Sequence, residues 1–147
     1  MRRLFARHCL LACALALVAC GPTISRFNAQ AYDQATSLKV EAQALMEQAT
    51  EPYPQHRSAV QEFKTELEKA YEFARGRPNN EISAQQWQIL ISPKRDLLGG
   101  FLRDWKERST LPAVLVTEKQ KQIADAFDTI IELESGKIKP ETVRTGP

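Results

Sequence analysis

Apolar side chains recur at spacings of three and four residues along most of this chain. Over residues 31–50 the apolar positions share one face of a helix, and residues 55–75 repeat the pattern. A third region and a last stretch that ends near Glu134 follow, and short turns between such helices favour antiparallel neighbours. No segment alternates as a strand does. The pattern predicts an all-α fold, a small antiparallel helical bundle of three to four helices, as one domain over residues 31–136.

The third region contains two possible helix starts. Ser83 and Gln86 have the spacing of a capping box, which predicts that a helix begins there. The pair Ser92–Pro93 predicts a second start, with the serine as N-cap and the proline in the first helical position. The pair Gly99–Gly100 lies inside this second helix and lowers its intrinsic stability. Close packing against a neighbouring helix is the favoured reason for these glycines, with a kink or a partner's approach as alternatives.

The last helix has two alternative starts. Pro112 favours a start near residue 112, whereas Thr117 and Gln120 form a capping box that favours a later one. Gly136 predicts the end of this helix, because glycine commonly follows the last helical residue. The tail, residues 137–147, is polar and contains two prolines, so we expect it to be disordered.

The N-terminus has a different pattern. Three arginines and no acidic residue precede an uncharged apolar run, residues 9–19, which reads CLLACALALVA. This run has the length of a signal-peptide core and is too short to cross a membrane, which takes about 20 apolar residues. No later segment reaches that length. We therefore expect residues 1–19 to be a signal peptide.

The apolar run ends in Leu17-Val18-Ala19-Cys20. This motif resembles the lipobox of bacterial lipoproteins, although the resemblance covers only the leader. It implies that Cys20 is lipidated and becomes the first residue, that residues 20–30 form a short tether, and that the protein is anchored in a bacterial membrane. Gly21 in place of aspartate implies the outer membrane, facing the periplasm. Ordinary secretion with cleavage after Ala14-Leu15-Ala16 is the alternative, and it would leave Cys20 as a free thiol.

Composition and charge exclude several classes of function. The chain has 20 basic and 18 acidic residues, and three of the arginines lie in the leader, so 17 basic and 18 acidic residues remain, a net charge of −1. A near-neutral domain lacks the basic face that nucleic-acid binding requires. The only cysteine after the leader is Cys20 itself, so no disulfide is expected.

Catalytic and metal chemistry lacks its usual residues. His56 is the single histidine after the leader, and we expect it to be solvated. A zinc site draws about four ligands from cysteine, histidine and carboxylate, so neither a metal nor another cofactor is expected. Glu81 and Asp104 are conceivable as the paired acids of a cell-wall hydrolase. We nevertheless expect no enzymatic activity.

The candidate binding residues are two tryptophans and one loop. Trp87 and Trp105 could anchor a protein partner, since tryptophan is enriched at interfaces, or they could fill the core. The loop that contains Arg77, Asn79 and Asn80 could bind a partner or simply connect two helices. The favoured interpretation is a non-enzymatic binding or adaptor module with a protein partner in the envelope. A structural or inhibitor-type lipoprotein is the alternative, and a carboxylate-based hydrolase comes last.

Overall fold

The structure, a computed structural model, describes residues 27–143 and is all-helical over that range. The fold class predicted from the sequence is therefore confirmed, but the expected number of three to four helices was too low for the described residues. The third region forms two separate helices, which brings the number of α-helices to five. The elements in chain order are α2 (Ala29–Glu47), η2 (Gln48–Thr50), α3 (Tyr53–Gly76), α4 (Glu81–Ile91), α5 (Leu98–Arg108), α6 (Ala113–Ser135) and η3 (Pro140–Thr142).

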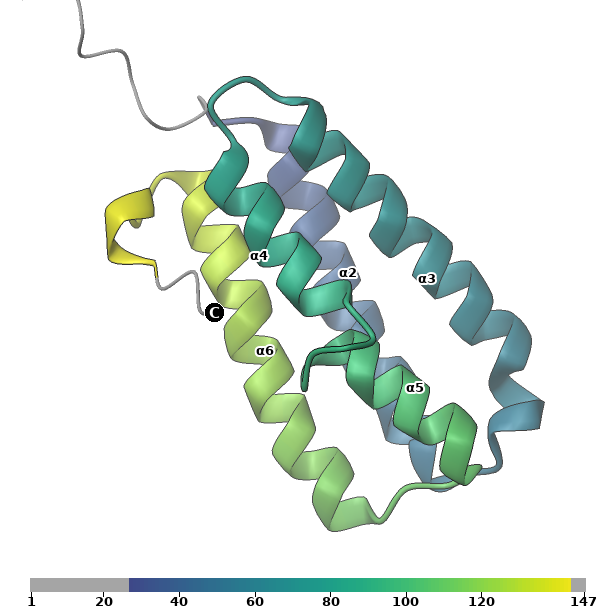
Figure 1. Ribbon diagram of the computed structural model, residues 1–147. Helices are drawn as coiled ribbons and strands as arrows, with labels where there is room; N and C mark the ends of the chain where they lie inside the picture. Colours follow the sequence, from purple (N-terminus) through teal and green to yellow (C-terminus); the bar gives the residue numbers. More distant parts are fainter. Residues whose placement is uncertain (1–26, 144–147) are drawn as a thin grey trace, which may run out of the picture.

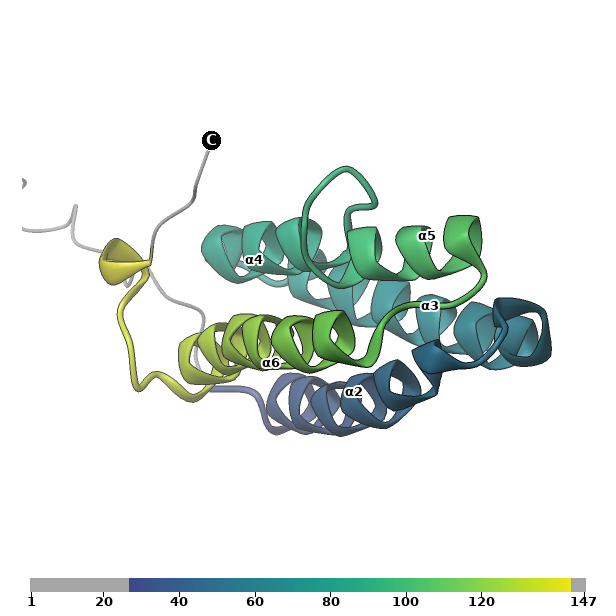
Figure 2. The ribbon, with the colours of Figure 1, turned by 90° about the horizontal axis from the view of Figure 1, so that it is seen from below.

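The helices α2, α3, α4 and α6 run alternately up and down the molecule (Figure 1). The helix α2 contacts α3 and α6, and α4 contacts the same two helices, so these four close a ring. The helix α5 follows α4 in the same general direction, and it packs against α3 and α4. The loop between α4 and α5 arches away from the other helices (Figure 2). The fold thus has four helical positions, one of which is divided between α4 and α5.

The apolar stripe of the first helix is buried, as its spacing predicts. Asn28 caps α2, because its side-chain oxygen accepts the N–H of Ala31 at 3.0 Å, so the helix begins at Ala29, two residues before the predicted domain start. Small side chains on this stripe allow α2 to lie close to α6. The buried residues of the stripe are Ala31, Ala35, Leu38, Ala42, Leu45 and Ala49.

Polar side chains also join α2 to α6. Lys39 and Asp128 form an ion pair with 2.6 Å between Nζ and Oδ2. The side-chain amide of Gln43 donates to the backbone oxygen of Gln120, and the amide of Gln120 donates to the backbone oxygen of Gln43, each at 3.2 Å. The ion pair and the reciprocal amide bonds thus connect α2 and α6 at two levels along their length.

The break in the third region differs from the prediction. Ser83 lies inside α4 rather than at its start, since the helix begins at Glu81. Ser92 ends α4, with its N–H donating to the oxygen of Gln88 at 3.1 Å, and α5 begins only at Leu98. The oxygen of Ser92 accepts instead from the N–H of residue 95, which makes a turn. Ser92–Pro93 therefore ends one helix and does not begin the next.

Two glycines explain where α5 begins. A Cβ atom on Gly99 would lie 2.1 Å from the backbone oxygen of Ile91, and a Cβ on Gly100 would lie 2.1 Å from that of Arg95. The first turn of α5 thus packs backbone against backbone on the end of α4 and on the connecting loop. Only glycine permits this approach, and the favoured interpretation of the pair as a close packing contact is confirmed.

The last helix follows the earlier of its two predicted starts. Pro112 is the N-cap of α6, and Thr117 lies within the helix, donating to the backbone oxygen of Ala113 at 3.0 Å. The tail for which disorder is expected, residues 137–147, contains the short helix η3 in its described part. Residues 144–147 lie outside the described residues.

Replacing Gly136 with alanine is expected to lower the free energy of unfolding by about 1 kcal/mol. Gly136 ends α6 with a φ of 72°, in the left-handed region that a Cβ atom disfavours. Gly136→Asn is expected to destabilise less, because asparagine enters this region more readily. Denaturant unfolding of the two variants measures the difference. Equal stability of the alanine variant and the native chain would contradict the expectation.

Candidate functional site

Both tryptophans belong to the core. Trp87 is 2% exposed and Trp105 is fully buried. The ring of Trp87 packs edge-on against Phe127 with 5.9 Å between centroids, and that of Trp105 packs in the same way against Tyr53 at 5.5 Å. Neither ring is presented to a partner, so the interpretation of Trp87 and Trp105 as interface anchors does not agree with their burial. The alternative, that they fill the core, is confirmed.

His56 is half-buried rather than fully solvated, contrary to expectation. Its ring centroid lies 5.4 Å from that of Trp105, and its Nε2 lies 2.9 Å from a carboxylate oxygen of Glu51. Trp105 in turn donates its indole N–H to the backbone oxygen of Glu51 at 3.0 Å. The turn between α2 and α3 therefore packs over Trp105. His56, at the start of α3, lies beside the same indole ring. Among the described residues, no group of three or more metal-ligating side chains surrounds this or any other point.

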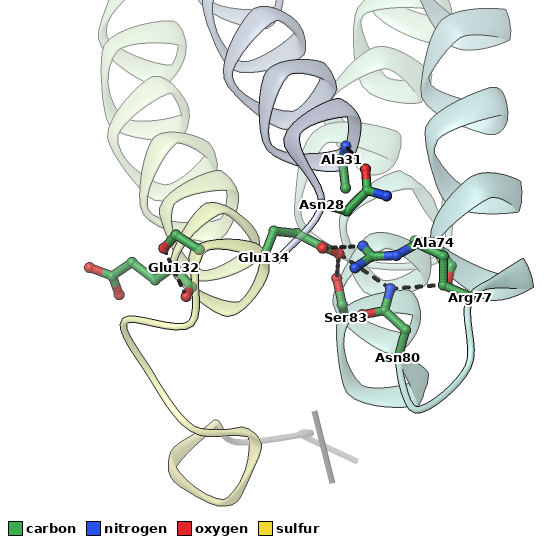
Figure 3. Close-up of polar contacts among 9 residues, drawn as sticks. Asn28, Ala31, Ala74, Arg77, Asn80, Ser83, Glu132 and Glu134 are labelled. Atoms are coloured by element: carbon green, nitrogen blue, oxygen red, sulfur yellow. Dashed lines mark hydrogen bonds and ion pairs between the residues drawn. The ribbon is translucent and has the colours of Figure 1, made fainter. Parts of the chain in front are cut away.

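A buried polar cluster lies at the opposite end of the molecule (Figure 3). Glu134, near the end of α6, is 3% exposed and forms an ion pair with Arg77. Ser83 donates its hydroxyl to the same carboxylate. Asn80 donates to Glu134 at 3.3 Å and to the backbone oxygen of Ala74 at 3.0 Å. The cluster thus joins the end of α3, the start of α4 and the end of α6.

This arrangement decides the role of the loop between α3 and α4. Arg77 and Asn80 point inward to Glu134 (Figure 3) and are not offered to a partner. Asn79 is exposed and has a φ of 55°, which asparagine tolerates in a turn. Of the two interpretations of this loop, a connection between two helices agrees with the structure, and a partner-binding role for Arg77 and Asn80 does not.

Glu134, the centre of this cluster, is not among the site residues predicted from the sequence. Its signal was present, because Glu134 continues the apolar stripe of Phe127 and Ile130 at a spacing of four residues. An acid at a core position needs a buried cationic or hydrogen-bonding partner. Arg77 could not be identified as that partner from the sequence, since 57 residues separate the two.

The two acids proposed for a hydrolase do not come together. Glu81 is exposed at the start of α4. Asp104 lies in the second half of α5, toward the opposite end of the molecule (Figure 1). Asp104 accepts hydrogen bonds from Arg103 at 2.6 and 2.9 Å, and these bonds raise the pKa of the guanidinium. Glu81 and Asp104 therefore do not flank a common cleft.

A groove between α2 and α3 is the candidate binding site. It has a volume of about 520 Å³. Leu45 and Phe63 form its floor and are themselves largely covered, while Ala44 and Ala59 are exposed and leave the groove open. The lining of this α2–α3 groove is Glu41, Ala44, Leu45, Gln48, Ala59, Glu62, Phe63 and Glu66.

Charge distinguishes the α2–α3 groove from a second pocket. Three of the residues that line the groove are glutamates and none is basic. Glu62 accepts a hydrogen bond from Ser58 at 3.0 Å, and Glu66 pairs with Lys69 at 2.6 Å. The second pocket, of about 210 Å³ beside the break between α4 and α5, carries both signs of charge through Lys64 and Glu68. Of these two pockets, the groove is the one that combines an apolar floor with a rim of one sign.

The leader and Cys20 lie outside the described residues. Within residues 27–143, no helix is long and apolar enough to cross a membrane. Comparisons with protein-family models, with curated proteins and with solved structures found no match to this chain. The features that bear on function are therefore the leader motif and the geometry of the helical domain.

Proposed function

We propose that this chain is a lipid-anchored bacterial envelope protein whose helical domain binds a protein partner and has no catalytic role. The observation that carries the proposal is Leu17-Val18-Ala19-Cys20 at the end of an uncharged run that follows a basic N-terminus. In the bacterial lipoproteins whose lipobox this motif resembles, diacylglycerol is attached to the cysteine. Two or three acyl chains together make a stable anchor, because each buried methylene contributes about 0.8 kcal/mol.

The distance between anchor and domain supports a role close to the membrane. The helix α2 begins at Ala29, capped by Asn28. Residues 21–27 connect Cys20 to this cap, and a chain of that length spans at most about 25 Å. The domain is a small antiparallel bundle held beside the lipid surface, and Gly21 favours the outer membrane, facing the periplasm. A partner must therefore come to the membrane or already be anchored there.

The geometry supports binding over the two alternatives. An inhibitor that inserts a loop into its target needs exposed loop side chains, and Arg77 and Asn80 are turned inward. A carboxylate hydrolase needs two acids across a cleft, and Glu81 and Asp104 lie toward opposite ends of the molecule. The α2–α3 groove remains as an open surface with a defined shape and charge.

Cys20→Ser is expected to abolish both lipid labelling and membrane association. Cells that express each variant are fed a fatty-acid probe, and the chain is followed through membrane fractionation. Cys13→Ser serves as the matched control, because it exchanges the same atoms inside the leader and leaves the lipobox cysteine in place. Labelling should be retained in this control. A native chain that is unlabelled and released from the membrane would contradict the proposal and favour ordinary secretion.

A further inference from the structure

We propose that the α2–α3 groove binds an amphipathic helix of a protein partner, one whose apolar stripe is flanked by lysine or arginine. This inference rests on the proposed role as a binding module and adds the chemistry of the partner. Three features of the groove support it: its shape, its charge and the apolar surface that continues beside it.

The shape of the groove suits a helix. The helices α2 and α3 run antiparallel, side by side, and a third helix can lie in the furrow between two such neighbours (Figure 1). The exposed methyl groups of Ala44 and Ala59 allow its backbone to approach closely. Larger side chains at spacings of three and four residues would then reach toward Leu45 and Phe63 on the floor.

The apolar surface continues beyond the groove. Val40 is 69% exposed and precedes Ala44 by four residues, which places both on the same side of α2. A second depression, lined by Thr36, Ser37, Val40 and Glu41, joins the groove at the shared residue Glu41. The available surface therefore extends along more than one turn of α2, as docking of a helix requires.

The charge of the rim selects the occupant. The carboxylate of Glu41 makes no hydrogen bond or ion pair with any described residue, and with Glu62 and Glu66 it gives the rim a single sign. A second copy of the chain docking groove to groove would place acids against acids, and anionic lipid headgroups would be repelled. Basic residues on either side of an apolar stripe would pair with the glutamates at the rim. These pairs would have a smaller desolvation cost than a fully buried ion pair.

The test uses a fluorescein-labelled peptide of alternating leucine and lysine blocks with one apolar face when helical. The full chain is held in phosphatidylcholine nanodiscs, and empty nanodiscs give the blank for fluorescence anisotropy. The double variant Glu41→Lys with Glu62→Lys is expected to weaken binding at least about tenfold. Ala59→Trp, which fills the groove from an exposed position, is expected to weaken it similarly. A peptide of the same composition with its apolar face scrambled should bind poorly.

The matched control is Glu118→Lys with Asp125→Lys, two exposed acids of α6 whose replacement changes the net charge by the same amount. Native-like binding by this control supports the proposal. Equal weakening by the control, or unchanged binding by the groove variants, overturns it. Sedimentation of the native chain as a dimer that the groove variants dissociate, without peptide binding, would instead assign the groove to a second copy and also overturns it. The same peptide titration with the Cys20→Ser chain free in solution does not need the anchor, so failure of the anchor is distinguished from failure of the groove to bind.

Discussion

Replacing Glu134 with alanine is expected to lower the free energy of unfolding by about 4 kcal/mol. The carboxylate is buried and accepts from Arg77, Ser83 and Asn80. Its removal leaves the guanidinium of Arg77 enclosed without its carboxylate partner, and it withdraws the acceptor from two further donors. The loss falls where α3, α4 and α6 meet, so all three helices lose a common contact. The melting temperature should fall by more than about 10 °C.

Glu132→Ala is the matched control for this variant. Glu132 lies on the same turn of α6, but its side chain points away from the cluster (Figure 3). Denaturant unfolding of the two variants should show a large loss for Glu134→Ala and a small one for Glu132→Ala. The double variant Arg77→Met with Glu134→Leu should recover part of the loss, because it removes both charges together. Equal stability of the two single variants would show that the cluster contributes little.

Replacing Gly99 with alanine is expected to lower the free energy of unfolding by about 3 kcal/mol. The new Cβ would lie 2.1 Å from the backbone oxygen of Ile91 and 2.5 Å from the carbonyl carbons of Ile91 and Ser92. These are backbone atoms, so no side-chain rotation relieves the contact. The start of α5 would have to move away from the end of α4, and Leu98 and Phe101, which are buried in that first turn, would move with it.

Gly76→Ala provides the control for the glycine variant. Gly76 is the last residue of α3, and a Cβ atom there would meet nothing within 4 Å. The helix propensity of alanine should make this replacement neutral or slightly stabilising. Thermal unfolding of the two variants compares the same chemical change in crowded and in open surroundings. A Gly99→Ala variant as stable as Gly76→Ala would contradict the expectation, because it would mean that the backbone at the end of α4 can shift without lowering the free energy of unfolding.

The helical stripes were the most predictable part of this fold. A period of three and four residues places α2, α3 and α6 within about three residues of their observed bounds, because burial of one face is enough to specify a helix. The break between α4 and α5 was harder to predict from the sequence. Ser92–Pro93 has the local chemistry of a helix start, yet it ends a helix, since the close approach at Gly99 determines where the next helix can begin.

The polar contacts were the least predictable part. His56 has no local reason to be half-buried, and it becomes so because α5 places Trp105 beneath the turn that precedes α3. In the sequence, Arg77 and Asn80 resemble ordinary loop residues. They are partners of a buried acid only because α6, which is distant in the sequence, places Glu134 beside them. The α2–α3 groove likewise depends on how two helices pack, and the sequence of either helix alone does not define it.

The bonds between α2 and α6 have a mechanical consequence. Force transmitted from a lipid anchor at Cys20 would enter the domain at Asn28 and act along the axis of α2. The ion pair of Lys39 with Asp128 and the reciprocal amide bonds of Gln43 lie side by side across that axis. They would therefore be strained in shear, all together, rather than peeled apart one after another. A tether that pulls on the domain thus meets its resistance in the contact between the first and last helices.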